Sequence, residues 1–294
     1  MTYHVEEEIL SQPDCWTRAA ELAPTVAADL PQQGERVAFV GCGTSWFVGQ
    51  VLASWRETAG LGESDAFTAS EFPGERRYDR VVALTRSGTT TEVLELLRAL
   101  AGKTPTTTVL GDLATPAPEV SDHVVDLSFA DEQSVVQTRF ATSTMALFRA
   151  AFGTDVQPII EGARAASTED LDERLVDADQ MTFVGRGWTV GIANEAALKF
   201  RETSSSWAES YPAMDYRHGP ISIASEGRAV WSFGEPPAGL GDQVTATGAL
   251  FVDNQRDALV DLVAAQRVAV ARAIKLGRNP DQPRNLTRSV VLPG

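Results

Sequence analysis

Apolar runs and amphipathic stretches alternate along the first half of the chain, which predicts strands and helices in turn. Apolar residues recur near helical spacing over 5–30 and predict a helix there. Four short apolar runs then predict strands, and the stretches that follow them predict helices. The expected strands are 37–40, 80–85, 107–110 and 123–127, and the expected helices are 46–58, 92–101 and 134–152. This alternation is typical of an α/β fold with a parallel sheet covered by helices on both faces.

The same order begins again after a polar connection at 166–179. A strand at 181–184 leads into a second glycine turn, and the glycine pairs keep a constant offset, since 185 − 41 and 187 − 43 both equal 144. An offset this long indicates two copies of one domain. The further elements expected are helices at 192–207 and 256–276, strands at 229–233 and 249–252, and a loop at 211–220. We therefore expect two domains, 1–165 with an N-terminal helix and 166–294 with a C-terminal tail, each a doubly wound five-stranded parallel sheet flanked by helices.

Charge and composition limit which ligands the protein can bind and which cellular compartment is expected. The 294 residues carry a formal charge of −15, so a nucleic-acid backbone would be repelled. No apolar run approaches the ~20 residues of a membrane-spanning helix. The acidic start lacks the features of a secretory signal, and the two cysteines form no disulfide framework. These observations predict a cytoplasmic protein with no nucleic-acid or membrane partner. A phosphorylated ligand would need local donors to overcome the negative field.

Two strand-to-helix turns supply such donors. In the turn 41–45, the glycines allow close approach of the backbone, and Gly43, Thr44 and Ser45 lie at the start of a helix, where N–H groups are free. In the loop 85–91, hydroxyl residues surround Ser87, and the guanidinium of Arg86 adds positive charge. A single hydroxyl here would be explained by helix capping. A run of them suits the three acceptor oxygens of a phosphate. The residues predicted to hold it are Gly43, Thr44, Ser45, Thr85, Arg86, Ser87 and Thr90.

Nucleotide and metal sites are not expected. Trp46 stands where the dinucleotide fingerprint requires its third glycine, and a Gly-Lys-Ser/Thr triphosphate loop is missing from the sequence. The histidines, cysteines and acidic residues have no metal-ligand spacing. The sequence thus predicts no cofactor and no metal.

One predicted helix carries candidate acid–base groups. Glu195, Lys199 and Glu202 are spaced i, i+4 and i+7 and so share one face. A solvated ion pair is the simpler explanation, but the neighbouring alanines, Leu198 and Phe200 indicate a buried helix. Burial moves a carboxylate toward a pKa suited to proton transfer. His218 is followed by Gly-Pro, which presents its imidazole in a turn, although an isolated histidine is as often structural. Cys42 has no activating neighbour and is expected to be a small packing residue.

Together these motifs resemble the sugar isomerase (SIS) domain family. The matching segments are 41–45, 85–92, 195–202, Ala208-Glu209, 217–220 and 281–286. They resemble most the tandem isomerase module of glucosamine-6-phosphate synthase and the stand-alone SIS amino-sugar phosphate deaminases and deglycases. The resemblance implies that Glu202 moves a proton between C1 and C2 of the sugar, that Glu195 and Lys199 contact or support it, and that His218 opens the ring. It also implies a homodimer with shared active sites.

Two departures from the synthase shape the expected reaction. The chain has no room for a glutaminase domain, so ammonia from glutamine is not expected. Arg288 stands where the synthase has the lysine that forms an imine with the sugar, and a guanidinium remains protonated and cannot form one. The resemblance then predicts an isomerase or deaminase of an amino-sugar phosphate, converting a substrate like glucosamine-6-phosphate to fructose-6-phosphate and ammonia. The alternatives are a deglycase of a sugar-phosphate amine conjugate and a non-catalytic protein that senses a phosphosugar.

Overall fold

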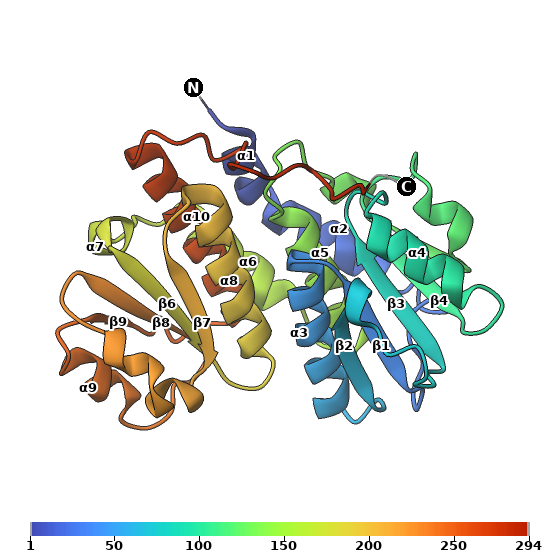
Figure 1. Cartoon of the computed structure of the whole chain (residues 1–294), viewed down its shortest axis with the longest axis horizontal. Coiled ribbons are helices and arrows are strands. Elements are labelled where there is room, and N and C mark those ends of the chain that lie inside the picture. The colour runs from blue at the N-terminus through green and yellow to red at the C-terminus, as the bar shows by residue number, and fades with distance from the viewer. Residues whose placement is uncertain (1, 293–294) are drawn as a thin grey trace. The chain divides into compact units, whose positions relative to one another are not determined.

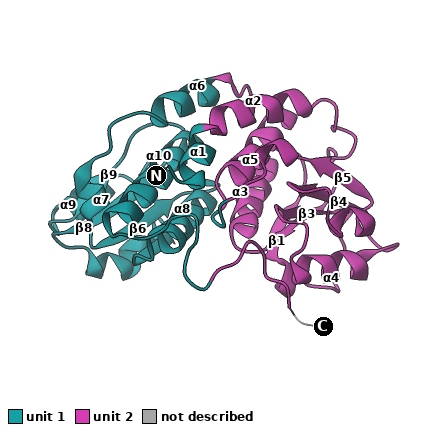
Figure 2. Cartoon of the chain, turned by 90° about the horizontal axis from the view of Figure 1, so that it is seen from above, with its two compact units in different colours: residues 1–10, 134–136, 158–285 teal, residues 11–133, 137–157, 286–294 magenta. Residues whose placement is uncertain are grey.

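The structure is a computed structural model that describes residues 2–292 (Figure 1). The described chain forms two compact units, coloured separately in Figure 2. Unit 1 comprises the residues up to 10, 134–136 and 158–285, whereas unit 2 comprises 11–133, 137–157 and the residues from 286 onward. Each unit is described here by itself.

Unit 2 is built on a five-stranded parallel sheet with the order β2-β1-β3-β4-β5. Its strands are β1 (Val37–Gly41), β2 (Ser64–Thr68), β3 (Arg80–Thr85), β4 (Thr106–Leu110) and β5 (His123–Asp126). Its helices are α2 (Gln12–Leu22), α3 (Thr44–Thr58), α4 (Thr91–Leu100) and α5 (Arg139–Ala151), with short 3-10 turns at η1 (Ala69–Glu71), η2 (Ala117–Val120) and η3 (Ser128–Ala130). Strands β1, β3 and β4 are buried along their whole length, as expected for central strands covered on both faces.

Unit 1 contains a four-stranded parallel sheet with the order β7-β6-β8-β9. Its strands are β6 (Gln180–Gly185), β7 (Ala208–Pro212), β8 (Arg228–Phe233) and β9 (Leu250–Val252). Its helices are α1 (His4–Leu10), α6 (Gln157–Ala166), α7 (Glu173–Asp177), α8 (Thr189–Ser204), α9 (Leu240–Thr245) and α10 (Ala258–Lys275), with 3-10 turns at η4 (Asp215–His218) and η5 (Pro220–Ile223). The aromatic rings of Phe183, Phe200 and Phe233 pack in its core, where the centroids of Phe183 and Phe200 are 5.3 Å apart.

The expected α/β architecture of parallel sheets flanked by helices is confirmed, but the second sheet differs from the prediction. We expected five strands in each sheet, whereas the described part of unit 1 has four. After β9 the chain passes through a short turn, and Asp257 caps α10 by accepting a hydrogen bond from the Leu259 N–H. The buried apolar residues of this segment are thereby used in a long helix, and none remain for a fifth strand.

The predicted helix over 5–30 is two shorter helices. Helix α1 ends at Leu10 and α2 begins at Gln12, with Pro13 in its first turn. A proline fits that position because it lacks the N–H that a helix interior would require. Helix α2 ends at Leu22, just before Pro24.

The two ends of the chain lie in different units. Helix α1 belongs to unit 1, where the Asp281 carboxylate accepts hydrogen bonds from the N–H groups of His4 and Val5 at 2.9 and 2.8 Å. The tail from 286 onward belongs instead to unit 2. These compact units reflect spatial packing, and the domain boundaries 1–165 and 166–294 stay a prediction.

Candidate functional site

The first glycine turn lies at the carboxyl edge of the sheet in unit 2. Strand β1 ends at Gly41, and Gly43 caps α3 with φ 55° and ψ −123°, a conformation that favours glycine. The next two residues, Thr44 and Ser45, are buried in the first turn of α3. Because β1 and β3 pair in parallel, with Val40 opposite Ala83, this turn and the hydroxyl loop after β3 emerge at the same edge. Ligands of open α/β sheets bind at this edge.

The loop 85–91, which we call the hydroxyl loop, is held by its own side chains. The Thr85 hydroxyl accepts a hydrogen bond from the Gly88 N–H at 3.2 Å, and the Ser87 hydroxyl accepts one from the Thr89 N–H at 3.3 Å. A Cβ at Gly88, where φ is 62°, would stand 2.1 Å from the Thr115 hydroxyl. The loop is therefore fixed in shape. Since Thr85 and Ser87 act as acceptors in these bonds, each keeps its hydroxyl proton for donation to another group.

The C-terminal tail contacts the same loop from the other side. The hydroxyls of Thr89 and Ser289 are 2.8 Å apart, and the Thr91 N–H donates to the Val290 carbonyl at 3.1 Å. The Leu292 N–H donates in turn to the Thr91 hydroxyl at 2.9 Å. The remaining threonine, Thr90, caps α4 without a side-chain capping bond. The tail therefore binds Thr89 and Thr91. Three predicted phosphate ligands, Thr85, Ser87 and Thr90, are not among the residues that bind it.

Arg86 is directed toward protein groups. Its guanidinium is buried, with Nη1 3.3 Å from Glu132 Oε2, and Nη2 donates to the Arg288 carbonyl at 3.1 Å. Glu132 in turn accepts hydrogen bonds from the N–H and the hydroxyl of Thr138. A contact between Arg86 and a phosphate stays a prediction.

Arg288 forms an ion pair close to Arg86. Its Nη2 lies 2.6 Å from Asp131 Oδ1 and 2.8 Å from Asp131 Oδ2, and its Nη1 donates to the Glu132 carbonyl. Neither acidic residue was singled out from the sequence. The signal was present, because Asp131 and Glu132 follow the last strand of the first sheet, at the edge where the hydroxyl loop also emerges.

The candidate acid–base residues lie together on α8 in unit 1. Lys199 Nζ is 2.6 Å from Glu202 Oε2 and 3.6 Å from Glu195 Oε1. Lys199 and Glu195 are almost fully buried, whereas the Glu202 side chain keeps 19% of its surface exposed. Glu202 is therefore the carboxylate of this cluster that reaches solvent.

His218 is exposed at the end of η4, also in unit 1. The adjacent Arg217 ties this turn to α9, because its Nε donates to Gln243 Oε1 at 2.7 Å and its Nη2 donates to the Ala238 carbonyl at 2.6 Å. His218 is thus exposed in a tethered turn, and its role in ring opening stays a prediction.

Cys42 is half-buried in the first glycine turn. Burial raises the pKa of the Cys42 thiol, and the nearby Glu92 carboxylate raises it further. A raised pKa leaves little thiolate at neutral pH, so this residue is suited to packing and not to nucleophilic attack.

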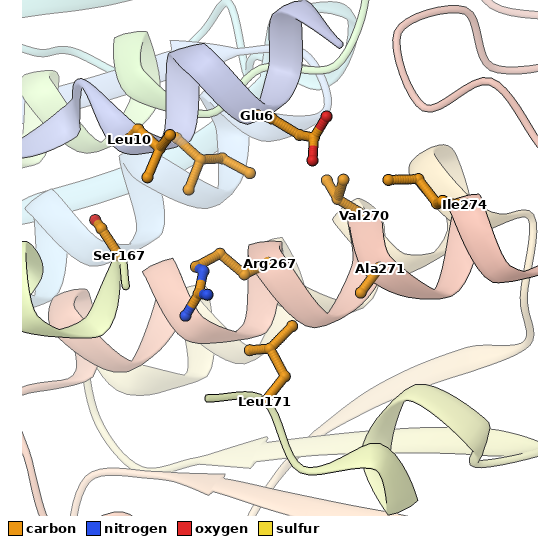
Figure 3. Close-up of a pocket in the computed structure, with 9 residues that line it drawn as sticks. Glu6, Leu10, Ser167, Leu171, Arg267, Val270, Ala271 and Ile274 are labelled. Carbon is orange, nitrogen blue, oxygen red and sulfur yellow. The ribbon is translucent and has the colours of Figure 1, made fainter. Parts of the chain in front are cut away.

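A separate apolar cavity of about 270 Å³ lies in unit 1 (Figure 3). Leu10 of α1 faces Val270 and Ala271 of α10 across it, with Leu171 on the connection that follows α6. None of the residues singled out from the sequence lines this cavity, so it does not belong to the candidate site.

Among residues 2–292, no group of three or more His, Cys, Asp or Glu side chains is placed to hold a metal ion. No helix in the same part of the chain is long and apolar enough to cross a membrane.

Comparison with known proteins shows homology to the isomerase module of glutamine–fructose-6-phosphate aminotransferase. The enzyme of that name from Sulfolobus acidocaldarius is 26% identical over 313 aligned residues, which cover 92% of this chain and 52% of the relative. The chain thus spans about half the length of the curated relatives it matches. None of the protein-family models that were compared matches it.

Solved structures confirm the fold. Glucosamine-6-phosphate deaminase from Thermotoga maritima superposes with a TM-score of 0.78 at 23% identity, covering 98% of this chain and all of that one. Tagatose-6-phosphate ketose/aldose isomerase from Escherichia coli also gives a TM-score of 0.78, at 19% identity over 98% of this chain and 96% of that one. At this identity the likeness establishes a shared fold, that of the phosphosugar isomerases.

Proposed function

We propose that this protein is an enzyme that acts on an amino-sugar phosphate, converting glucosamine-6-phosphate or a close analogue to fructose-6-phosphate and ammonia. The observation that carries the proposal is the state of the hydroxyl loop. Thr85 and Ser87 use their lone pairs on backbone N–H groups and keep their protons, at a sheet edge where ligands of this fold class bind. In a chain of charge −15, such neutral donors suit a phosphate monoester.

In this proposal Glu202 is the acid–base residue. Its carboxylate takes the proton from C2 of the open-chain amino sugar and returns it to C1, while a second proton passes from the amino nitrogen to O1, which converts the amino aldose into the imine of the ketose. Water then adds to C2 of that imine, ammonia leaves, and fructose-6-phosphate remains. Lys199, with Nζ 2.6 Å from Glu202 Oε2, holds the carboxylate in position for this transfer. His218 protonates the ring oxygen so that the sugar opens.

Arg288 favours this reaction over a synthase-like amination. A guanidinium stays protonated and cannot form an imine with a ketose, and in this chain it is paired with Asp131. We therefore do not assign it an amination that passes through an imine with the ketose.

The test is a coupled assay with glucosamine-6-phosphate that follows ammonia and fructose-6-phosphate together. Changing Glu202→Gln should lower the turnover number by roughly 10²–10⁴-fold, because the acid–base group is lost. The variant should still be stabilised against heat by the substrate. Glu226→Gln, which neutralises an exposed carboxylate in the same unit, is the matched control and should keep full activity.

Two results would redirect the assignment. Thermal stabilisation by sugar phosphates without turnover of any in a panel would indicate a non-catalytic phosphosugar sensor. Turnover of amine conjugates of the sugar phosphate, with no reaction of the free amino sugar, would indicate a deglycase. Full activity of Glu202→Gln would exclude Glu202 as the proton carrier.

A further inference from the structure

Two arginines and two carboxylates form one network in unit 2. Arg86 pairs with Glu132 through Nη1, and Arg288 holds both carboxylate oxygens of Asp131 through Nη2. The pairs are joined twice, since Arg288 Nη1 donates to the Glu132 carbonyl and Arg86 Nη2 donates to the Arg288 carbonyl. We call these four residues the arginine clamp. It connects the hydroxyl loop, the turn after β5 and the C-terminal tail.

The inner and outer pairs of the clamp differ in burial. The side chains of Arg86 and Glu132 are 1% and 0% exposed, so neither charge can lose its partner without leaving an uncompensated buried ion. The side chains of Arg288 and Asp131 are 35% and 31% exposed. The inner pair is therefore part of the folded core, whereas the outer pair can be cut while water solvates the remaining charge.

The outer pair determines where the tail lies. The residues directly after Arg288 are those that bind the hydroxyl loop: Ser289 meets Thr89, and Val290 accepts the Thr91 N–H. Arg139 holds the backbone of Asp131 in place, because its Nε donates to the Asp131 carbonyl at 3.0 Å. The Arg288 guanidinium is held at two points, Nη2 by the Asp131 carboxylate and Nη1 by the Glu132 carbonyl, so these contacts set the register of the tail on the loop.

We propose that Arg288 is a positioning residue for phosphate binding. Its ion pair with Asp131 holds residues 288–292 on the hydroxyl loop, so that Thr89 and Thr91 are hydrogen-bonded to the tail. The hydroxyl protons of Thr85, Ser87 and Thr90 are then presented together to a phosphate. Arg288 contributes no direct contact with the ligand. The inference rests on the proposed function for the phosphate site, whereas the attachment of the tail does not depend on it.

The first experiment measures tail attachment without any activity. Hydrogen–deuterium exchange reports on the Thr91 and Leu292 amides, which donate to the tail and to the loop respectively. Arg288→Gln and Asp131→Asn should each speed exchange of these amides several-fold, and the double variant should be no faster than either. Arg288→Lys keeps the charge but has one nitrogen in place of the two that contact Asp131 and the Glu132 carbonyl, so its exchange rates should fall between. Arg98→Gln, on the exposed face of α4, is the matched control.

The second experiment measures affinity for inorganic phosphate by titration calorimetry. Arg288→Gln and Asp131→Asn should bind phosphate several-fold more weakly than the parent. If the parent also turns over glucosamine-6-phosphate, KM should rise by a similar factor with kcat unchanged, because the acid–base residues of α8 are untouched.

The outcomes separate this inference from the proposed function. Weaker phosphate binding and a freed tail, in a protein that turns over no sugar, would uphold the role of Arg288 while refuting the enzyme assignment. Unchanged amide exchange, unchanged phosphate affinity in the variants, or no phosphate binding by the parent would each overturn the inference. A fall in kcat at constant KM would overturn it as well, since it would show a role in chemistry.

Discussion

At the residue scale, the hydroxyl loop divides chemically similar side chains between two tasks. Thr85 and Ser87 accept backbone N–H bonds, whereas Thr89 and Thr91 bind the tail about 200 positions later in the chain. The sequence could predict that hydroxyls gather at a helix start and that they suit a phosphate. It could not assign Thr89 and Thr91 to the tail, because that contact depends on tertiary folding and leaves no local pattern.

The arginine of the same loop illustrates a second limit of sequence reasoning. Arg86 beside Ser87 was interpreted as a charge at the edge of the ligand. In the folded chain its guanidinium lies against Glu132, 46 positions away. A buried ion pair of this kind requires both partners, and nothing in the spacing of either residue indicates the other.

Tyr216 provides a prediction for the dependence of stability on pH. It is fully buried among apolar side chains of unit 1, and burial raises the pKa of its phenol to about 12. In the unfolded chain a tyrosine ionises near pH 10. Ionisation between these values favours the unfolded state, so the free energy of unfolding should fall as the pH rises from 10 to about 12, by up to roughly 2–3 kcal/mol.

Denaturant titrations over this pH range would test the effect. The Tyr216→Phe variant has no phenol to ionise and should lose less stability than the parent across the same interval. Equal losses in the two proteins would show that another group controls the alkaline transition.

At the scale of helices and strands, the success of prediction followed the hydrophobic pattern. The central strands β1, β3, β6 and β8 contain apolar runs and β4 is rich in β-branched residues, and each was predicted within a residue or two. Strands β2 and β7 were missed. Their sequences, Ser-Asp-Ala-Phe-Thr and Ala-Glu-Ser-Tyr-Pro, are largely polar, and both lie at sheet edges where burial is partial. Edge strands are specified by pairing with a neighbour more than by their own composition.

Arg56 connects α3 to β2 and supports one such edge. This fully buried guanidinium donates to the carbonyls of Gln32, Leu61 and Glu63 and to the Ser64 hydroxyl at 2.6–3.3 Å. Replacing Arg56→Met would remove four hydrogen bonds donated by a charged group, which should cost roughly 3 kcal/mol or more. Urea denaturation followed by circular dichroism measures the loss. Arg98→Met, at an exposed position of α4, should change stability by less than about 0.5 kcal/mol. Equal effects of both changes would refute this role of Arg56.

At the scale of the whole molecule, the acidic charge and a repeated order of predicted elements could be read from the sequence, but the attachment of the chain ends could not. Helix α1 lies in unit 1 and the tail lies in unit 2, while the domain boundaries 1–165 and 166–294 stay a prediction. The Asp281 carboxylate at the start of α1 and the Arg288–Asp131 pair account for the two attachments. Both are single long-range contacts, which no periodicity in the chain reveals.

The proposed homodimer makes a whole-molecule prediction. If His218 completes the site of the partner subunit, mixing the inactive variants Glu202→Gln and His218→Ala should restore activity. Half of the randomly formed dimers contain one of each chain, and each of these has one intact site of two, so about a quarter of parental activity is expected. No recovery, with subunit exchange verified by mass spectrometry, would show that His218 serves its own chain.

The placement of the chain ends also determines the order in which the two units can be completed during translation. Residues 11–133 and 137–157 of unit 2 leave the ribosome early, yet the tail that covers their hydroxyl loop follows only after the 128 residues 158–285 of the other unit. At about 5–20 residues per second, that delay is roughly 6–26 s. During this interval the hydroxyl loop of the nascent chain is not covered by the tail, and α1 has no α10 to pack against. Translation pausing and chaperone capture would therefore act on a half-finished protein, because each compact unit is complete only when nearly all of this sequence has been made.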